Sequence, residues 1–175
     1  MIDRILLAVD GSQNAERATD LAAELATKLT AELFIVHVLM HGRPTEELVH
    51  MAEVEHLVKE AQAAISPSIA YVTGSHPELL GGSKTDPRGE RLISVLGDQI
   101  VARAKTICAE QGVKTIKTSV RTGDYGEEIL NAAKEFDADM IVIGSRGLGL
   151  LKSNVLGSVS QKVLHHAGCS VVTVR

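Results

Sequence analysis

The chain has 175 residues, of which 45% are hydrophobic and 2% aromatic, and its formal net charge at pH 7 is -4. The hydrophobic content excludes a disordered chain, and the length favours one domain with an aliphatic core. The negative charge and the scarcity of aromatic side chains argue against a nucleic-acid-binding surface, which needs basic patches or stacking platforms.

Short strands and helices alternate along the chain. Continuous apolar runs predict buried parallel strands, and apolar residues that recur every three or four positions predict helices. Strands are expected over residues 5–9, 33–39, 114–121, 138–143 and 170–174. Helices are expected over residues 15–29, 45–65, 90–111, 125–136 and 159–166. Ser12 or Asn14 would cap the first helix, and Gly112 and Gly168 would end the third and the last.

Residues 66–89 break this alternation. They hold three of the four prolines and four glycines, which is typical of a long irregular connection. The strand over residues 114–121 has only a weak alternating pattern, which suits the edge of a sheet.

Strands that alternate with helices pair in parallel through right-handed crossovers. We therefore predict an α/β fold with an open parallel five-stranded sheet of order 3-2-1-4-5 and helices on both faces. In this order the first and fourth strands are neighbours where the winding reverses, and ligands bind there, outside the carboxyl ends of the strands. Asp10 ends the first strand and Gly144 ends the fourth, so both are expected at one crevice.

A glycine-rich loop links the fourth strand to the last helix. It reads Gly144-Ser145-Arg146-Gly147, then nine residues, then Gly157-Ser158. Glycines let the backbone approach an anion, amide hydrogens point at its oxygens, and the helix N-terminus adds partial positive charge. The spacing excludes a Walker A loop, because Leu151 precedes Lys152, and a dinucleotide fingerprint, because Lys152 replaces the third glycine. The alternative is a flexible surface loop with a glycine helix cap.

The chain resembles the ATP-binding members of the universal stress protein family. The resemblance rests on residues 5–12, on the pair His37-Val38 at the end of the second strand, and on the complete Gly-x2-Gly-x9-Gly-Ser pattern. It implies an adenine-nucleotide α-hydrolase-like fold, with a single domain over residues 1–175. The chain departs from the family around residues 40–99, where it carries an inserted helix and an irregular loop.

The resemblance also implies a ligand, ATP with Mg, and roles for matching residues. Asp10 would lie near the ribose hydroxyls and near Mg, and Val38 would meet the adenine through its backbone. The residues that would surround the phosphates, mostly through backbone amides, are Gly144, Gly147, Gly157, Ser158 and Val159. A carboxylate can accept two ribose hydroxyls, and charge-assisted hydrogen bonds contribute about 1.5–3 kcal/mol each.

The function that the resemblance implies is a nucleotide-dependent regulator of the stress response, with slow ATP hydrolysis at most. The sequence shows no efficient catalytic base and no nucleophile elbow. An alternative is a protein-interaction module that does not depend on nucleotide. An adenylating enzyme of related architecture is disfavoured, because residues 10–14 lack the Ser-Gly-Gly-x-Asp-Ser sequence that follows the first strand there.

Several residues have simpler interpretations, which stay open. Asp10 could be only a turn or helix-capping carboxylate. His37 would be a packed or backbone-bonded histidine rather than a ligand. His165 and His166 would sit at a helix C-terminus, where positive charge is favourable, with metal binding as the alternative.

The expected partners are ATP, a second copy of the chain and an unidentified regulatory protein. The family commonly pairs through the last strand, here Ser170–Val174, and an unpaired apolar edge is an aggregation hazard. Residues 66–89 are expected to be mobile and to fold over the nucleotide. Cys108 and Cys169 are expected as buried reduced thiols, and no signal peptide or membrane-length apolar run is visible, which predicts a cytoplasmic protein without membrane insertion.

Overall fold

The computed structural model describes residues 1–39, 87–147 and 156–175, and it contains five strands and four helices there. The strands are β1 (Arg4–Ala8), β2 (Glu32–Leu39), β3 (Ile116–Thr122), β4 (Met140–Gly144) and β5 (Ser170–Val174). The helices are α1 (Gln13–Leu29), α4 (Pro87–Glu110), α5 (Tyr125–Phe136) and α6 (Ser158–His166). No helix in these three ranges is both long and apolar enough to cross a membrane.

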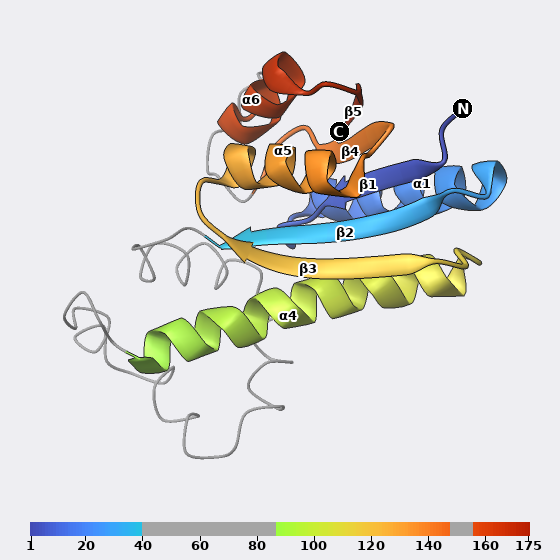
Figure 1. Ribbon diagram of the computed structural model, residues 1–175. Helices are drawn as coiled ribbons and strands as arrows, with labels where there is room; N and C mark the ends of the chain where they lie inside the picture. Colours follow the sequence, from blue (N-terminus) through green and yellow to red (C-terminus); the bar gives the residue numbers. More distant parts are fainter. Residues whose placement is uncertain (40–86, 148–155) are drawn as a thin grey trace.

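The strands form one parallel sheet in the order β3-β2-β1-β4-β5, which confirms the predicted fold class and topology. Helices α1 and α4 cover one face, and α5 and α6 cover the other (Figure 1). β1 and β4 are neighbours, with Leu6 opposite Ile141. The carboxyl ends of β1, β2 and β4 therefore meet at one edge, where a parallel sheet of this kind binds ligands.

The sheet separates two hydrophobic cores, and successive side chains of the central strand β1 pack alternately into one and the other. Ile5 and Leu7 pack with α1 and α4, whereas Leu6 and Ala8 pack with α5 and α6. Successive residues of a strand point to opposite faces, so a strand covered on both sides must be apolar throughout. The core is almost entirely aliphatic, as the composition implies.

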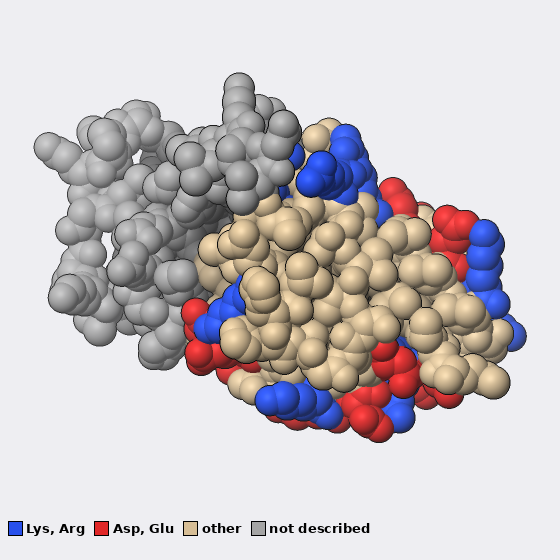
Figure 2. Space-filling view, turned by 90° about the horizontal axis from the view of Figure 1, so that it is seen from above, with Lys and Arg blue, Asp and Glu red and all other residues tan. Residues whose placement is uncertain are grey.

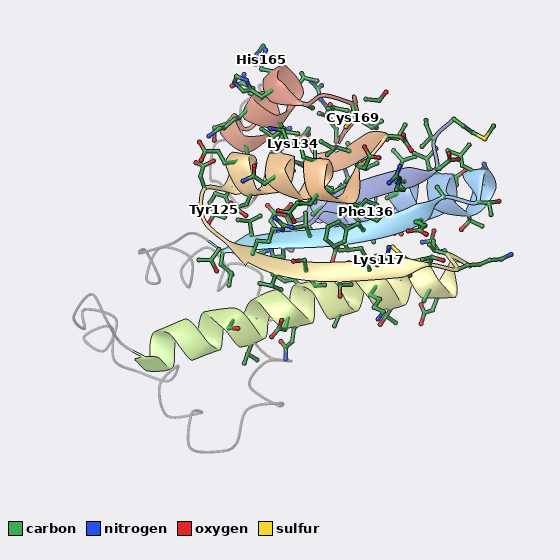
Figure 3. All side chains as sticks on the ribbon, viewed as in Figure 1. Lys117, Tyr125, Lys134, Phe136, His165 and Cys169 are labelled. Atoms are coloured by element: carbon green, nitrogen blue, oxygen red, sulfur yellow. The ribbon has the colours of Figure 1, made fainter. Side chains whose placement is uncertain are left out.

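The two phenylalanines lie on the α5 side of the sheet. The rings of Phe34 and Phe136 have centroids 5.0 Å apart. Lys117 Nζ lies 5.4 Å from the Phe136 centroid, and Figure 3 shows these two side chains between β3 and α5. This cluster secures the edge strand β3 rather than building a site.

Several predicted boundaries hold and one needs correction. Tyr125–Phe136 and Ser170–Val174 match the prediction, and Gly112 has φ +90 after the end of α4. Residues 87–89 are helical rather than irregular, because α4 begins at Pro87, and proline is favoured where a helix leaves N–H groups without acceptors. The last helix ends at His166, as predicted, and Ala167 leaves it in an extended conformation just before Gly168. The helix predicted over residues 45–65 and the connection over 66–86 lie outside the described residues.

Candidate functional site

Asp10 follows β1 and helps to form the turn into α1. Its Oδ1 accepts a hydrogen bond from the Ser12 N–H at 3.0 Å, and Gly11 adopts φ +79 between them. Ser12 then caps α1, because its Oγ accepts from the Ala15 N–H at 3.2 Å. Asp10 thus takes part in the turn with one oxygen, and its second oxygen faces the neighbouring loop.

That second oxygen meets the glycine loop after β4. A Cβ added at Gly147 would collide with Oδ2 of Asp10. Asn14 reinforces the contact, since its Nδ2 donates to the Arg146 carbonyl at 3.3 Å. The sequence predicted that Asp10 and the loop would converge, and the structure brings them into direct contact.

Gly144 is a second place where the backbone comes close. A Cβ there would lie 3.1 Å from the backbone N of Ala15 and from the carbonyl carbon of Asn14. Any side chain would therefore push the first turn of α1 away from the end of β4. The glycine lets α1, and with it the Asp10 turn, pack against the strand that carries the loop.

The N-terminus of α6 has no side-chain cap. Its N-cap residue is Gly157, whereas Ser12 and Asp124 cap α1 and α5 with side-chain oxygens. The first intrahelical bond runs from the Gln161 N–H to the Gly157 carbonyl at 2.9 Å. The N–H groups of Ser158 and Val159 therefore have no intrahelical acceptor, and they carry the partial positive charge of the helix end.

The Gly157 amide is engaged within the loop itself. Its N–H donates to the Ser145 carbonyl at 2.8 Å, and the Ser145 N–H donates to the Val174 carbonyl. Of the amides expected around an anion, those of Ser158 and Val159 thus have no acceptor within the helix, whereas the Gly157 amide is bonded to Ser145. A Cβ added at Gly157 would make only ordinary contacts, because the nearest atoms would be 3.5 Å away.

Two serines that sequence reasoning did not single out support the loop. Ser160 Oγ donates to the Gly144 carbonyl at 2.8 Å and so ties α6 to the end of β4. Ser145 is 1% exposed, and its Oγ has no hydrogen-bond partner in the described part of the chain. Nothing in the sequence spacing could have indicated that Ser160 reaches the Gly144 carbonyl.

Lys162 fastens α6 to the N-terminus of α5. Its Nζ lies 2.9 Å from Asp124 Oδ1 and 3.0 Å from Glu127 Oε1. The Lys162 chain crosses Gly126, where a Cβ would lie 2.7 Å from Lys162 Cδ. The Glu127 N–H, and then Lys162, lower the pKa of Asp124 below its usual value. This ion pair holds the helix whose N-terminus borders the glycine loop.

Val38 lies at the carboxyl end of β2 with its side chain buried. Even-numbered residues of β2 direct their backbone groups toward β1: the Glu32 N–H donates to the Asp3 carbonyl, and the Val36 carbonyl accepts from the Val9 N–H. Because this direction repeats every two residues along a strand, the N–H and C=O of Val38 point the same way. β1 ends at Ala8, opposite Val36, but the Val9 N–H still pairs with the Val36 carbonyl, so the backbone groups of Val38 face the segment that follows β1.

His37 is buried, and its Nδ1 lies 2.8 Å from the Val9 carbonyl. This confirms the prediction of a backbone-bonded histidine. His165 and His166 are exposed at the end of α6, and His165 projects outward in Figure 3. Within residues 1–39, 87–147 and 156–175, no three His, Cys, Asp or Glu residues gather as metal ligands.

Known proteins resemble this chain over its whole length. The model of the Universal stress protein family matches residues 1–175. Universal stress protein YxiE of Bacillus subtilis is 34% identical over 180 aligned positions, which cover 100% of both chains.

Solved structures of low sequence identity share the fold. A universal stress protein in complex with cAMP has a TM-score of 0.60 and 19% identity, covering 99% of this chain and 97% of its own. The universal stress protein from Archaeoglobus fulgidus in complex with dAMP has a TM-score of 0.59 and 21% identity, covering 100% of this chain and 98% of its own.

Proposed function

The chain belongs to the universal stress protein family, and from this premise we propose that it binds ATP at the carboxyl edge of β1, β2 and β4 and acts as a nucleotide-dependent regulator in the stress response. The observation that carries the proposal is the uncapped N-terminus of α6. It lies beside a loop whose glycine touches the Asp10 carboxylate. An anion is the natural partner for such a helix end.

In this proposal each part of ATP has its own partner in the protein. The amides of Ser158 and Val159 would bind phosphate oxygens, Gly147 and Gly157 would keep the approach free of side chains, and Gly144 would hold the start of the loop close to α1. Asp10 would accept the ribose hydroxyls and lie near Mg, whose other ligands would be phosphate oxygens and water. Val38 would present its backbone N–H and C=O to the adenine. Amide N–H groups suit phosphate oxygens, and a carboxylate suits a hard cation such as Mg²⁺.

The two nucleotide complexes among the similar structures support an adenine nucleotide as the ligand. They contain cAMP and dAMP, which share the adenine base and a phosphate with ATP. We extend that chemistry to this chain because the same fold here brings amides, a carboxylate and a free strand end together. Hydrolysis is expected to be slow at most, since Asp10 is the only carboxylate that we assign to the site and it is held in a turn.

The regulatory proposal includes a homodimer through β5, with a further protein partner of unknown identity. The Ser170 N–H donates to the Asp139 carbonyl, and the Val174 carbonyl accepts from Ser145, so even-numbered residues of β5 face β4. Val171 and Thr173 consequently direct their backbone groups away from the sheet. Figure 2 shows this side of the molecule, where uncharged residues cover a broad area. A second β5 could pair there.

We also propose that residues 1–175 form one domain in the cytoplasm. The match over residues 1–175 supports the first statement, and the two free thiols, Cys108 and Cys169, support a reducing compartment. Cell fractionation followed by immunodetection tests the second statement, which recovery in a membrane or exported fraction would contradict.

The decisive experiment identifies the nucleotide carried through purification. Mass spectrometry of the denatured protein's supernatant should detect ATP, and equilibrium dialysis of nucleotide-free protein should show saturable ATP binding that Mg alters. Dialysis with GTP is the matched control for the base. Lack of any bound nucleotide in both measurements would favour the alternative, a protein-interaction module that does not depend on nucleotide.

A further inference from the structure

The ladder of hydrogen bonds between β1 and β2 ends in an unusual way. Its regular rungs alternate, with the Glu32 N–H donating to Asp3 and the Val9 N–H donating to Val36. The next rung of a parallel ladder would run from the Val38 N–H to the Val9 carbonyl. Among the described residues that hydrogen bond is not formed. The Val9 carbonyl is instead 2.8 Å from Nδ1 of His37.

The partner atom determines the state of the His37 ring. A carbonyl oxygen can only accept, so Nδ1 carries the hydrogen in this contact. Val9 is buried, and its carbonyl would lack this donor without the ring. His37 thus satisfies the Val9 carbonyl, just after the end of β1, with a side chain, and the Val38 N–H does not have to bond there.

Space for the ring comes from a glycine inside helix α4. A Cβ at Gly97 would lie 3.1 Å from His37 Cδ2, 3.3 Å from Val120 Cγ1 and 3.4 Å from Leu39 Cδ2. All three neighbours belong to the sheet, so none is the end of a freely moving surface chain. Glycine in a helix interior costs about 0.5–1 kcal/mol relative to alanine, which indicates a packing reason for it.

We propose that His37 is the positioning residue for recognition of the base. By taking the Val9 carbonyl, it leaves the Val38 N–H directed into the crevice beside the Val38 C=O. One donor and one acceptor then face the ligand together. Adenine offers the complementary pair, since N1 accepts and the N6 amino group donates, whereas guanine presents N1–H and O6 in the reverse sense. This inference rests on the proposed adenine-nucleotide function and adds the source of its base selectivity.

Two substitutions separate this role from simple packing. His37→Leu fills the space without a donor, and the Val38 N–H is then expected to close the ladder onto Val9. ATP should bind roughly two- to tenfold more weakly, which corresponds to the loss of one hydrogen bond, while GTP binding changes less. His37→Asn keeps an N–H near the position of Nδ1 and should restore much of the selectivity. A role in packing alone would lower stability without moving the ratio of GTP to ATP dissociation constants.

A nucleotide-free measurement keeps the inference testable whatever the ligand is. NMR of the labelled wild-type protein should show His37 protonated at Nδ1 and no scalar coupling through a hydrogen bond from the Val38 amide to the Val9 carbonyl. In His37→Leu that coupling should appear. A Val38–Val9 coupling in the wild type would overturn the proposal, as would a folded His37→Leu protein with unchanged selectivity. Failure of the wild type to bind any nucleotide would instead refute the proposed function. The NMR result would still show which donor bonds to the Val9 carbonyl.

Discussion

The carboxylate of Asp10 lies directly against Gly147, although the two residues come from opposite ends of the chain. Asp10 cannot simply rotate away, because its other oxygen holds the Ser12 N–H. The position of the carboxylate in the crevice therefore depends on the absence of a side chain at residue 147.

Gly147→Ala should weaken ATP binding and lower stability modestly. The new Cβ would displace the Asp10 carboxylate, while Gly147 itself is exposed and does not have a left-handed φ. We expect the free energy of unfolding to fall by about 0.5–1.5 kcal/mol, the contribution of the Asp10–Ser12 hydrogen bond that the displaced carboxylate would weaken. Gly168→Ala is the matched control, since no atom lies within 4 Å of a Cβ there. Equal ATP affinities for the two variants would show that Asp10 does not contribute to binding.

Gly157→Val should abolish ATP binding in a protein that still folds. The nearest atoms to a Cβ at Gly157 are 3.5 Å away, and its φ is −65, so a side chain is tolerated there. That side chain would occupy the approach to the amides of Ser158 and Val159. Circular dichroism should confirm the fold and dialysis the loss of binding. Undiminished ATP binding by the folded variant would refute the assignment of the phosphate site.

Thr173→Pro should convert a dimer into a folded monomer. Proline lacks the N–H, which at Thr173 points away from β4, so the sheet ladder keeps its bonds. Val172→Pro is the contrast, because its N–H belongs to the ladder with β4 and its loss should destabilise the fold. Light scattering at protein concentrations of about tens of micromolar, where a dimer with an interface of standard size stays associated, measures the oligomeric state. A wild-type protein that is already monomeric there would argue against the dimer.

Replacing Asp124 should reduce stability in a pH-dependent way. Its Oδ1 accepts from the Glu127 N–H at 3.0 Å, and loss of such a cap through Asp124→Ala costs about 0.5–2 kcal/mol. The folded-state pKa of Asp124 is lowered, so its charge stabilises the protein above the ordinary pKa, and this stabilisation disappears as the pH falls through the lowered pKa.

Asp124→Asn separates the charge from the cap. It retains an oxygen for the Glu127 N–H but loses the attraction to Lys162. Urea unfolding at pH 7 should rank wild type above Asp124→Asn and Asp124→Ala, and wild type and Asp124→Asn should converge at strongly acidic pH. A difference between them that stays constant with pH would show that the charge of Asp124 plays no part.

Cys108 should resist alkylation in the folded protein. The thiol is fully buried in α4, and burial raises its pKa to about 12, so almost none of it is the reactive thiolate at pH 8. Cys169 is only partly buried and should react sooner. Peptide mass spectrometry after iodoacetamide treatment distinguishes them, with urea-unfolded protein as the control in which both react. Rapid labelling of Cys108 without urea would indicate local opening of α4.

Much of the fold was predictable because its rules are local or topological. Apolar runs and helical spacing located the five strands and the described helices to within a few residues. Parallel strands joined by right-handed crossovers leave few possible orders, and the order places Asp10 and Gly144 at the same crevice. The start of α4 was missed because Pro87 and Gly89 resemble loop residues, although proline is acceptable in the first turn of a helix.

The sequence by itself thus determined the sheet order and the meeting of Asp10 with the glycine loop after β4. Only the tertiary structure decided which polar groups there remain available. Whether the Val9 carbonyl accepts from Val38 or from the His37 ring depends on where β1 ends opposite β2 and on the space that Gly97 leaves in a helix far along the chain. Hydrogen bonds of this kind are chosen by distances of a few tenths of an ångström between segments that are remote in sequence, and residue spacing carries no record of those distances.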